Sequence, residues 1–238
     1  MHAALLKAQI LRTQIEENLP SAFTVYRRAQ HGSIATGISQ IDSAVPGVPL
    51  HALTEICGSG VLSSGKMSVL TSLLAQATRE QFCALVDAAD SFDPASAQAA
   101  DVHLQRLLWV RCGKSRVKLP PLEQAFKVAD ILLQSGGFGL IAVDLSGISE
   151  RVVRKVPLSS WFRFSRVIEK YSAALVFVEQ EPHATSCAAL VLRVVSEPAV
   201  FPGNLLTHLN LKVEIVRSPG KKMAASERKG FSLRTQWA

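Results

Sequence analysis

The segment from Glu55 to Leu70, EICGSGVLSSGKMSVL, constrains the chain most, because it has the order of a β-strand, a glycine-rich turn and an α-helix. Within it, residues 60–66 fit the pattern G-x-x-x-x-G-K. In such a loop the glycines allow backbone N–H groups to face a phosphate, and the lysine adds positive charge where the helix begins. The segment therefore predicts a phosphate-binding loop between a strand and a helix.

The residue after the lysine departs from this pattern. A Ser or Thr is expected there, because its hydroxyl holds the magnesium ion of a bound nucleotide, but the residue is Met67. A thioether is a poor ligand for so hard a cation. We therefore expect ATP or ADP to bind, if at all, with weak or no magnesium. The loop residues that would contact it are Gly60, Ser63, Ser64, Gly65, Lys66 and Ser68.

The composition favours one main α/β domain. The chain has 238 residues, of which 48% are hydrophobic and 19% are charged, which suits one sizeable core. No early basic segment leads into an apolar run with a small-residue cleavage site, and no apolar run reaches membrane-spanning length. We expect a cytoplasmic protein with no membrane contact.

Cysteine and histidine spacing gives no sign of a metal site. The four cysteines, Cys57, Cys83, Cys112 and Cys187, contain no C-x-x-C pair, and the histidines contain no H-E-x-x-H motif. Three of the cysteines lie in or at the end of apolar runs, so we expect buried, reduced thiols. No metal site made of protein side chains alone is expected.

The formal charge of +7 is unevenly distributed. Basic residues gather near the C-terminus and in a second group after residue 150, and such clusters favour a polyanion such as nucleic acid. A solvated basic surface is the alternative, and charge alone leaves both open. The candidate DNA contacts are Arg151, Arg154, Lys155, Lys221, Lys222, Arg228 and Lys229.

Short apolar runs alternate with helical patterns along the chain. Strands are expected at residues 51–57, 82–87, 107–111, 140–144 and 174–178, and helices at 66–79, 120–135 and 159–171. Three later strands, at 188–194, 209–216 and 231–237, are expected to be antiparallel or edge strands. The fold class is therefore α/β, with a mostly parallel twisted sheet covered on both faces by helices. We divide the chain into an N-terminal helical segment (1–30), a core (31–200) and a basic C-terminal strand or hairpin extension of the core (201–238).

The order and wording of these segments resemble the core of the bacterial RecA recombinase. The matching pieces are TGISQID at 36–42, EI at 55–56, SSGK at 63–66, LVDA at 85–88, FDP at 92–94 and LIAVD at 140–144. Together they cover roughly residues 34–216. The resemblance implies a RecA-like P-loop NTPase core in which Lys66 contacts phosphate, Asp144 belongs to the magnesium shell and Gln180 senses the γ-phosphate.

The departures from the family bear on activity. Where the family has the glutamate that activates water, this chain has Ala89, and where a tyrosine stacks on adenine it has Ser96. Losing a general base costs a factor of about a hundred to ten thousand in rate. We expect no efficient hydrolysis and no catalytic residue. The alternative is an active DNA-dependent ATPase of the recombinase superfamily, with Asp90 as a displaced base and Ser68 as a displaced metal ligand.

Two segments bear on DNA contact. The family has a long glycine-rich DNA-binding loop after the position of Gln180, whereas Glu181–Ser186 is a short connector, so strand exchange is not expected. The family's other DNA-binding loop corresponds to Ser146–Ser159, which contains the basic group after residue 150. In the following segment, Trp161 and Phe164 could stack on bases or lie in the core.

A small RecA-like chain with these losses and a basic C-terminus is similar to the ImuA-type proteins of bacterial translesion-synthesis cassettes. That resemblance implies a non-catalytic or weakly nucleotide-binding adaptor in SOS-induced mutagenic translesion synthesis and DNA repair. Its partners would be an ImuB-like Y-family polymerase homologue, the RecA filament and an error-prone replicative-type polymerase, with electrostatic contact to DNA. A further alternative is a cell division inhibitor induced by DNA damage.

Overall fold

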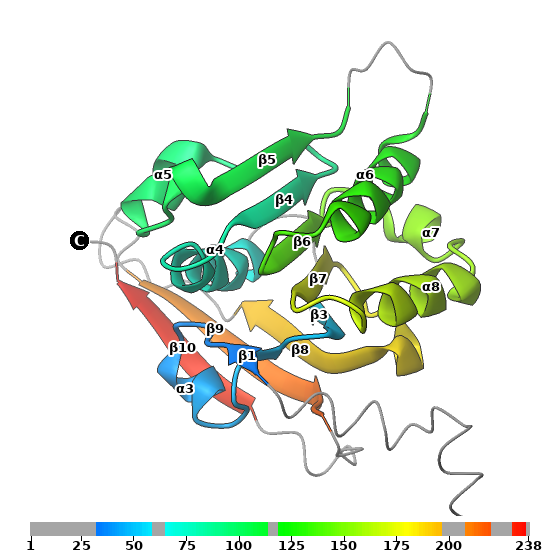
Figure 1. Cartoon of the computed structure of the whole chain (residues 1–238). Helices are drawn as coiled ribbons and strands as arrows, with labels where there is room; N and C mark the ends of the chain where they lie inside the picture. The colour runs from blue at the N-terminus through cyan, green and yellow to red at the C-terminus, as the bar shows by residue number, and fades with distance from the viewer. Residues whose placement is uncertain (1–31, 59–64, 114–118, 197–207, 220–229, 237–238) are drawn as a thin grey trace, which may run out of the picture.

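The computed structural model describes residues 32–58, 65–113, 119–196, 208–219 and 230–236, with the backbone alone for 208–210 and 230–236 (Figure 1). The N-terminal helical segment predicted at 1–30 lies outside the described residues. So do Gly60, Ser63 and Ser64 of the phosphate loop, and so do Lys221, Lys222, Arg228 and Lys229.

An eight-stranded sheet in the order β10-β9-β8-β3-β7-β6-β4-β5 forms the centre of the molecule. The six strands from β8 to β5 are parallel, whereas β9 is antiparallel to both β8 and β10. The strands are β3 (Ala52–Cys57), β4 (Cys83–Asp87), β5 (Leu107–Arg111), β6 (Leu140–Asp144), β7 (Ala174–Glu179), β8 (Ala188–Ser196), β9 (His208–Arg217) and β10 (Gly230–Gln236). The predicted α/β fold class is confirmed, with β9 and β10 as the antiparallel C-terminal strands. Strand β8 was also expected to be an antiparallel or edge strand, but it lies inside the sheet, parallel to β3 and antiparallel to β9.

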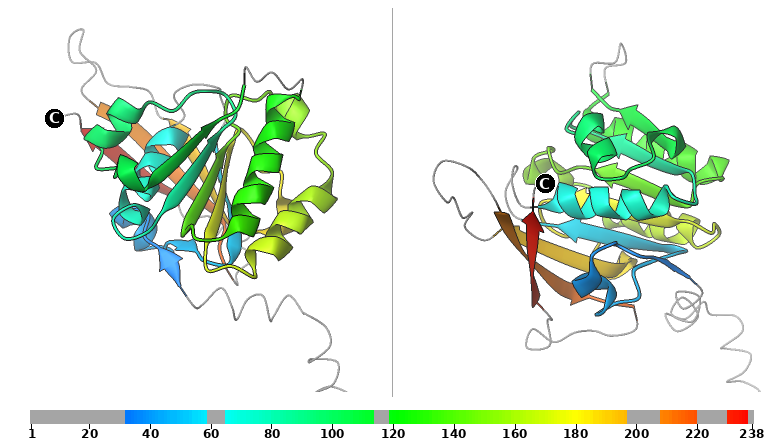
Figure 2. Two further views of the ribbon diagram at one scale, coloured as in Figure 1. Left: turned by 45° about the horizontal axis from the view of Figure 1, so that its top comes forward. Right: turned by 90° about the vertical axis from the view of Figure 1, so that its left-hand side faces the viewer.

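Helices cover both faces of this sheet (Figure 2). The main ones are α4 (Lys66–Ala77), α5 (Pro94–Ala99), α6 (Pro121–Ser135) and α8 (Leu158–Ile168). Side chains of α4 and α5 share one apolar cluster, and those of α6 and α8 share the other. Shorter elements are α3 (Ser39–Asp42), α7 (Glu150–Val153), the 3₁₀ turns η1 (Leu104–Arg106) and η2 (Thr185–Cys187), and a small sheet of β1 (Ser33–Ile34) and β2 (Val48–Pro49).

The strand sequences explain this layering. All residues of β3, β4, β6 and β7 are buried, and alternate residues belong to opposite clusters: Leu53 and Cys57 face α6 and α8, whereas Ile56 faces α4. A strand covered on both faces is apolar at nearly every position, as these runs are. This pattern made their positions readable from the sequence.

Local signals set the helix ends. Asp93 caps α5, because its side chain accepts hydrogen bonds from the N–H groups of Ala95 and Ser96. Gly136, in the left-handed region with φ of 66°, follows the last residue of α6. The helix expected to reach Tyr171 stops at Ile168, since the N–H groups of Lys170 and Tyr171 bond to carbonyls three residues back and form turns.

The strand register places four side chains at one edge of the sheet. Asp87 lies opposite Asp144, and Cys57 lies opposite Glu179, each at the carboxyl end of its strand. In open parallel sheets, ligands bind outside this edge. The phosphate loop, which follows β3, starts here too.

Candidate functional site

The phosphate loop joins α4 at Gly65, which has φ of +80°. A Cβ added to this glycine would lie 2.5 Å from two methyl carbons of Leu211, on β9. Both the left-handed backbone and the close approach of Leu211 therefore require glycine. The C-terminal strands thus pack directly against the end of the loop.

Lys66 begins α4 and is buried, with 3% of its surface exposed. Its Nζ donates a hydrogen bond of 2.9 Å to the carbonyl oxygen of Gly58, at the start of the loop. Burial lowers the pKa of Lys66, and the nearby charge of Asp144 acts in the opposite direction. In this conformation the lysine ties the two ends of the loop together.

Met67 and Ser68 follow. Met67 is half-buried and packs against the apolar cluster on the α4 face. Ser68 is exposed. The position that would hold magnesium therefore contributes to the core, and it offers no oxygen to a cation.

Asp144 ends β6 and is fully buried. Its Oδ1 accepts a hydrogen bond of 2.8 Å from the N–H of Ser146, and its Oδ2 accepts one of 2.8 Å from the hydroxyl of Ser91. Both carboxylate oxygens thus have protein partners. Ser91 was not identified from the sequence, since only the pairing of β4 with β6 brings it to Asp144.

Asp87 holds the loop that follows β4. Its carboxylate accepts hydrogen bonds from the N–H groups of Ala89, Ser91 and Phe92, and from the indole of Trp109 on β5. A buried carboxylate with this many donors has a structural role in shaping the turn. The sequence placed Asp87 at a strand end but did not indicate this role.

Ala89 and Asp90 occupy this loop. A Cβ added to Gly147 would lie 2.3 Å from the Cβ of Ala89, so the loops after β4 and β6 are in close contact. Asp90 has φ of 57°, and its two oxygens pair with Arg111 at 2.6 and 2.5 Å. Since β5 is an edge strand, this pairing directs Asp90 toward the outside of the sheet.

Gln180 follows β7 and contacts the neighbouring loop. Its Nε2 donates to the carbonyl oxygens of Ser146 and Ile148, at 3.2 and 3.1 Å. The next strand begins at Ala188, so the connector is as short as the sequence predicted. Gln180 therefore links the end of β7 to the segment that leads into α7.

Comparison with known proteins places the chain. Residues 22–151 match the family described as the RecA N-terminal domain, which is more than half of the chain. The chain belongs to this family. It is 34% identical over 116 residues to Protein RecA of Rickettsia bellii (strain OSU 85-389), covering 47% of this chain and 31% of that protein. It is 38% identical over 114 residues to Protein RecA of Ectopseudomonas oleovorans, covering 47% and 30%. The matched region thus spans less than a third of either relative.

A group of buried acids lies beside the strand-loop-helix of β3 and α4. The Oε1 of Glu55 accepts two hydrogen bonds of 2.6 Å, from the N–H groups of His183 and Ala184. The Oε2 of Glu179 lies 2.7 Å from Nδ1 of His183. The remaining oxygen of each acid has no hydrogen-bond partner among the described residues. This group was not predicted from the sequence, because the apolar runs around both acids suggested only strands.

Burial sets the charge of this group. It raises the pKa of Glu55, and it raises the pKa of Glu179 to about 7, while the hydrogen bond from His183 opposes the second shift. The same bond raises the pKa of His183. Near neutral pH Glu179 therefore holds part of a proton that an exposed carboxylate would have released.

The basic residues Arg151, Arg154 and Lys155 are exposed in and after α7, and Arg154 pairs with Glu150 at 3.4 Å. Trp161 and Phe164 are buried against Phe126 and Phe177 in edge-on and tilted contacts. The hypothesis that these two rings stack on bases is therefore wrong, and the core interpretation is confirmed. The exposed aromatic of this helix is Phe162.

Other predictions concern thiols, metals and membranes. All four cysteines are free and buried, as predicted. Within the described ranges no group of three or more His, Cys, Asp or Glu side chains could hold a metal ion. No helix in this part of the chain is long and apolar enough to span a bilayer.

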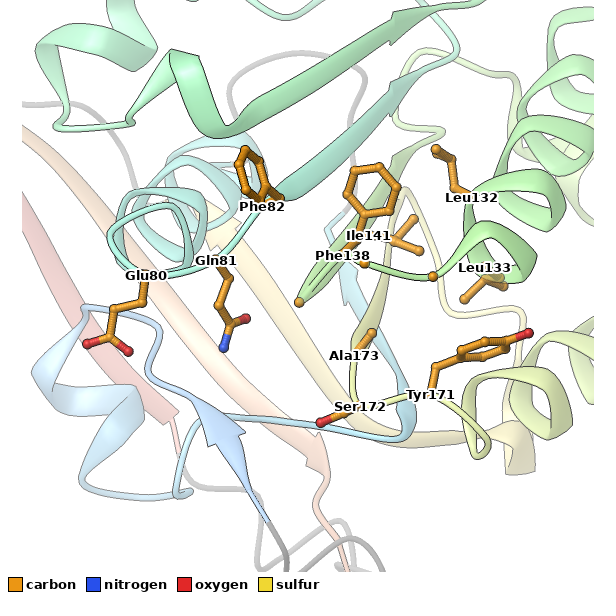
Figure 3. Close-up of a pocket in the computed structure, with 13 residues that line it drawn as sticks. Glu80, Gln81, Phe82, Leu132, Leu133, Phe138, Ile141, Tyr171, Ser172 and Ala173 are labelled. Atoms are coloured by element: carbon orange, nitrogen blue, oxygen red, sulfur yellow. The ribbon is translucent and has the colours of Figure 1, made fainter.

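A hollow of about 440 Å³ lies at the other end of the parallel strands, where they begin (Figure 3). Phe82, Phe138 and Tyr171 surround it, beside residues that precede β4, β6 and β7. The buried Oε1 of Gln81 has no partner in the described structure, although its side chain packs over Gly139. The predicted nucleotide and DNA contacts do not line this hollow.

Proposed function

We propose that this RecA-family chain is an adaptor in DNA repair that hydrolyses ATP poorly or not at all. The observation that carries the proposal is the state of the acids at the carboxyl edge. Asp87 and Asp144 accept hydrogen bonds from backbone and side chains, and Asp90 is paired with Arg111. Each of these three aspartates is thus engaged in contacts within the protein.

The residue types around this edge support the same conclusion. Met67 supplies no magnesium ligand, Ala89 no base, and Ser96 no aromatic ring for adenine. These three losses come from separate segments and affect three separate steps. Loss of the base alone lowers the rate by a factor of about a hundred to ten thousand.

Residual nucleotide binding remains part of the proposal. ATP or ADP would bind through Gly65, Lys66 and the start of α4, where the helix dipole favours a phosphate. A phosphate would share the Lys66 ammonium group with the carbonyl oxygen of Gly58, which accepts from one of its three N–H donors. Binding would therefore be weak and nearly independent of magnesium.

The setting we propose is mutagenic translesion synthesis in the SOS response. The partners would be an ImuB-like Y-family polymerase homologue, the RecA filament and an error-prone replicative-type polymerase. The ImuA-type resemblance supports these partners and an electrostatic contact with DNA. A pull-down from damage-treated cells tests the setting, and recovery of only a division protein would favour an inhibitor of cell division.

The test of the no-turnover proposal is ATP hydrolysis by the purified full chain, with magnesium and single-stranded DNA. We expect a rate at least about a hundredfold below that of a RecA protein assayed beside it. The Lys66→Ala variant should show the same background. Robust DNA-stimulated hydrolysis that Lys66→Ala abolishes would overturn the proposal.

The displaced-base alternative needs its own variants. If Asp90 were a base, Asp90→Ala would abolish any turnover, and Arg111→Ala would raise it by releasing the carboxylate from its ion pair. We expect neither change. Ser68→Ala tests the displaced metal ligand in the same assay, and unchanged turnover removes Ser68 from the mechanism.

A further inference from the structure

The exposed apolar side chains of the described residues are unevenly spread along the chain. Seven large hydrophobic residues are exposed in the described part of the chain: Phe82, Leu108, Ile131, Val152, Leu158, Phe162 and Val195. Three of the seven lie between residues 152 and 162. Single exposed apolar residues need no explanation, but a group close in the chain indicates a contact surface.

The geometry of α8 gathers this group further. Leu158 and Phe162 are four residues apart, so they lie on the same side of the helix, one turn from each other, and are 45% and 43% exposed. Trp161, Phe164 and Ile168 fill the buried face, which lies next to it around the helix. Helix α8 is therefore apolar on two sides, and only one of them is covered by its own chain.

This surface is strongly basic. Residues 150–170 contain four arginines and two lysines but only two acids, Glu150 and Glu169. Arg163 pairs with Asp130 at 2.5 Å and Arg154 with Glu150 at 3.4 Å. The other basic residues form no ion pair within the described structure; they are Arg151, Lys155, Arg166 and Lys170.

We propose that the surface formed by α7, α8 and the turn between them docks an acidic amphipathic segment of a partner protein. Apolar side chains of the segment would cover Leu158 and Phe162, and its carboxylates would face Arg151 and Arg166. The inference rests on the adaptor function for the existence of a partner. The inference adds the site at which the partner binds and the chemistry of the segment that the partner presents.

Composition favours a protein over a nucleic acid at this surface. Val152 and Leu158 are aliphatic and offer no face for base stacking. Arginine and phenylalanine are enriched in protein interfaces and lysine is depleted, and arginines outnumber lysines here by four to two. Residues 1–31 of this chain fit poorly as the occupant, because they carry four basic residues against two acidic ones.

The surface is connected to the carboxyl edge of the sheet, where a nucleotide would bind. The segment that leads into α7 contains Ser146 and Ile148, whose carbonyl oxygens accept the hydrogen bonds from Gln180. A segment bound on α7 and α8 would therefore restrain the same loop that Gln180 holds. The docking surface and Gln180 thus both contact the backbone that leads into α7.

Fluorescence anisotropy on the full chain tests the proposal with three probes. The first is an acidic peptide of about 20 residues with Leu and Phe at helical spacing, the second has the same composition in scrambled order, and the third is single-stranded DNA of similar length. We expect the first peptide to bind at least about tenfold tighter than the second, and Phe162→Ser and Arg166→Glu each to weaken it about tenfold.

Matched variants control for fold and charge. Phe82→Ser removes a phenylalanine that is more exposed than Phe162, 61% against 43%, and lies beside the hollow before β4, and Lys127→Glu reverses an exposed charge on α6. Neither should change peptide binding, and thermal unfolding of all four variants should match the parent, because the substituted side chains are exposed. Equal binding of both peptides, or no effect of Phe162→Ser, would overturn the proposal.

Two outcomes separate this inference from the proposed function. If DNA binds tightest and Phe162→Ser and Arg166→Glu weaken it, the surface is a nucleic-acid site and the protein-docking proposal is wrong. ATP hydrolysis is measured on the same preparations. If the peptide does not bind and ATP is not hydrolysed, only the docking proposal is wrong. If the peptide binds and ATP is hydrolysed, only the proposal of a non-catalytic adaptor is wrong.

Discussion

Among single residues, Glu55 and Glu179 have the most costly environment, because each keeps a buried carboxylate oxygen without a partner in the described structure. Glu55 holds the connector after β7 through the N–H groups of His183 and Ala184. Glu179 and His183 bracket Gln180, so their protonation bears on the backbone that positions it. A buried acid avoids much of the desolvation cost by taking up a proton.

These pKa shifts predict that the protein loses stability as the pH rises from about 5 to 8. In the unfolded chain Glu179 has the ordinary glutamate pKa of 4.5 and releases its proton near that pH, whereas the folded chain keeps the proton until about pH 7. The raised pKa of His183 acts in the same direction, because its charged form is stabilised only in the folded state. The folded state thus binds more protons in this window, and the free energy of unfolding falls as they are released.

Urea denaturation at several pH values measures this slope. The Glu179→Gln variant should show a smaller loss between pH 5 and 8, because the amide cannot titrate. A parent protein that gained stability over this range, or a variant with an unchanged slope, would contradict the assignment.

Among the elements, α8 is held by aromatic contacts with two other elements. The Trp161 ring lies 5.0 Å from that of Phe177 and 5.5 Å from that of Phe126. These partners come from β7 and α6, and Phe164 joins the same group. The aromatic cluster therefore fastens α8 to the sheet and to α6.

Trp161→Ala is expected to lower the free energy of unfolding by about 3–5 kcal/mol, because it leaves a large cavity in this cluster. Phe162→Ala, one residue away, should change it by no more than about 0.5 kcal/mol, since that side chain is half-exposed. Chemical denaturation of the two variants gives the comparison. Equal losses would mean that the buried and exposed faces of α8 are assigned wrongly.

The sequence predicted elements better than it predicted side-chain partners. Strand β6 was expected at residues 140–144 and is found there, because a strand buried on both faces is a continuous apolar run. The helix before it was expected at 120–135 and ends at Ser135. The pairing of Asp90 with Arg111 and the proximity of Glu55 to Glu179 could not be predicted, because both depend on which strands are neighbours. In the segment WFRF at 161–164, three of the four residues are aromatic, so the sequence did not show which of them face the core.

For the whole molecule, β9 and β10 extend the sheet beyond its parallel part. Leu211, Val213 and Ile215 of β9 are buried in the cluster on the α4 face. Strand β10 pairs with β9 from Gly230 to Gln236 and forms the outer edge of the sheet. The C-terminal strands thus complete the core and also shield β9 from solvent on its open side.

A chain that ends at residue 219 should be less stable and should self-associate. Without β10, the backbone N–H and C=O groups of β9 form an exposed edge, which readily pairs with another chain. Denaturation midpoints and size-exclusion chromatography, compared with the full chain, measure both effects. A truncated chain with the midpoint and elution volume of the full chain would show that β10 contributes little.

The contact between Leu211 and Gly65 has a mechanical consequence. Because the leucine methyl groups lie against Gly65, where the loop joins α4, a shift of β9 would change the packing at this junction. In an ATPase, the nucleotide drives such a movement and the strands respond. In a chain that does not turn ATP over, information would travel the other way: what the C-terminal strands hold would decide whether the loop admits a nucleotide.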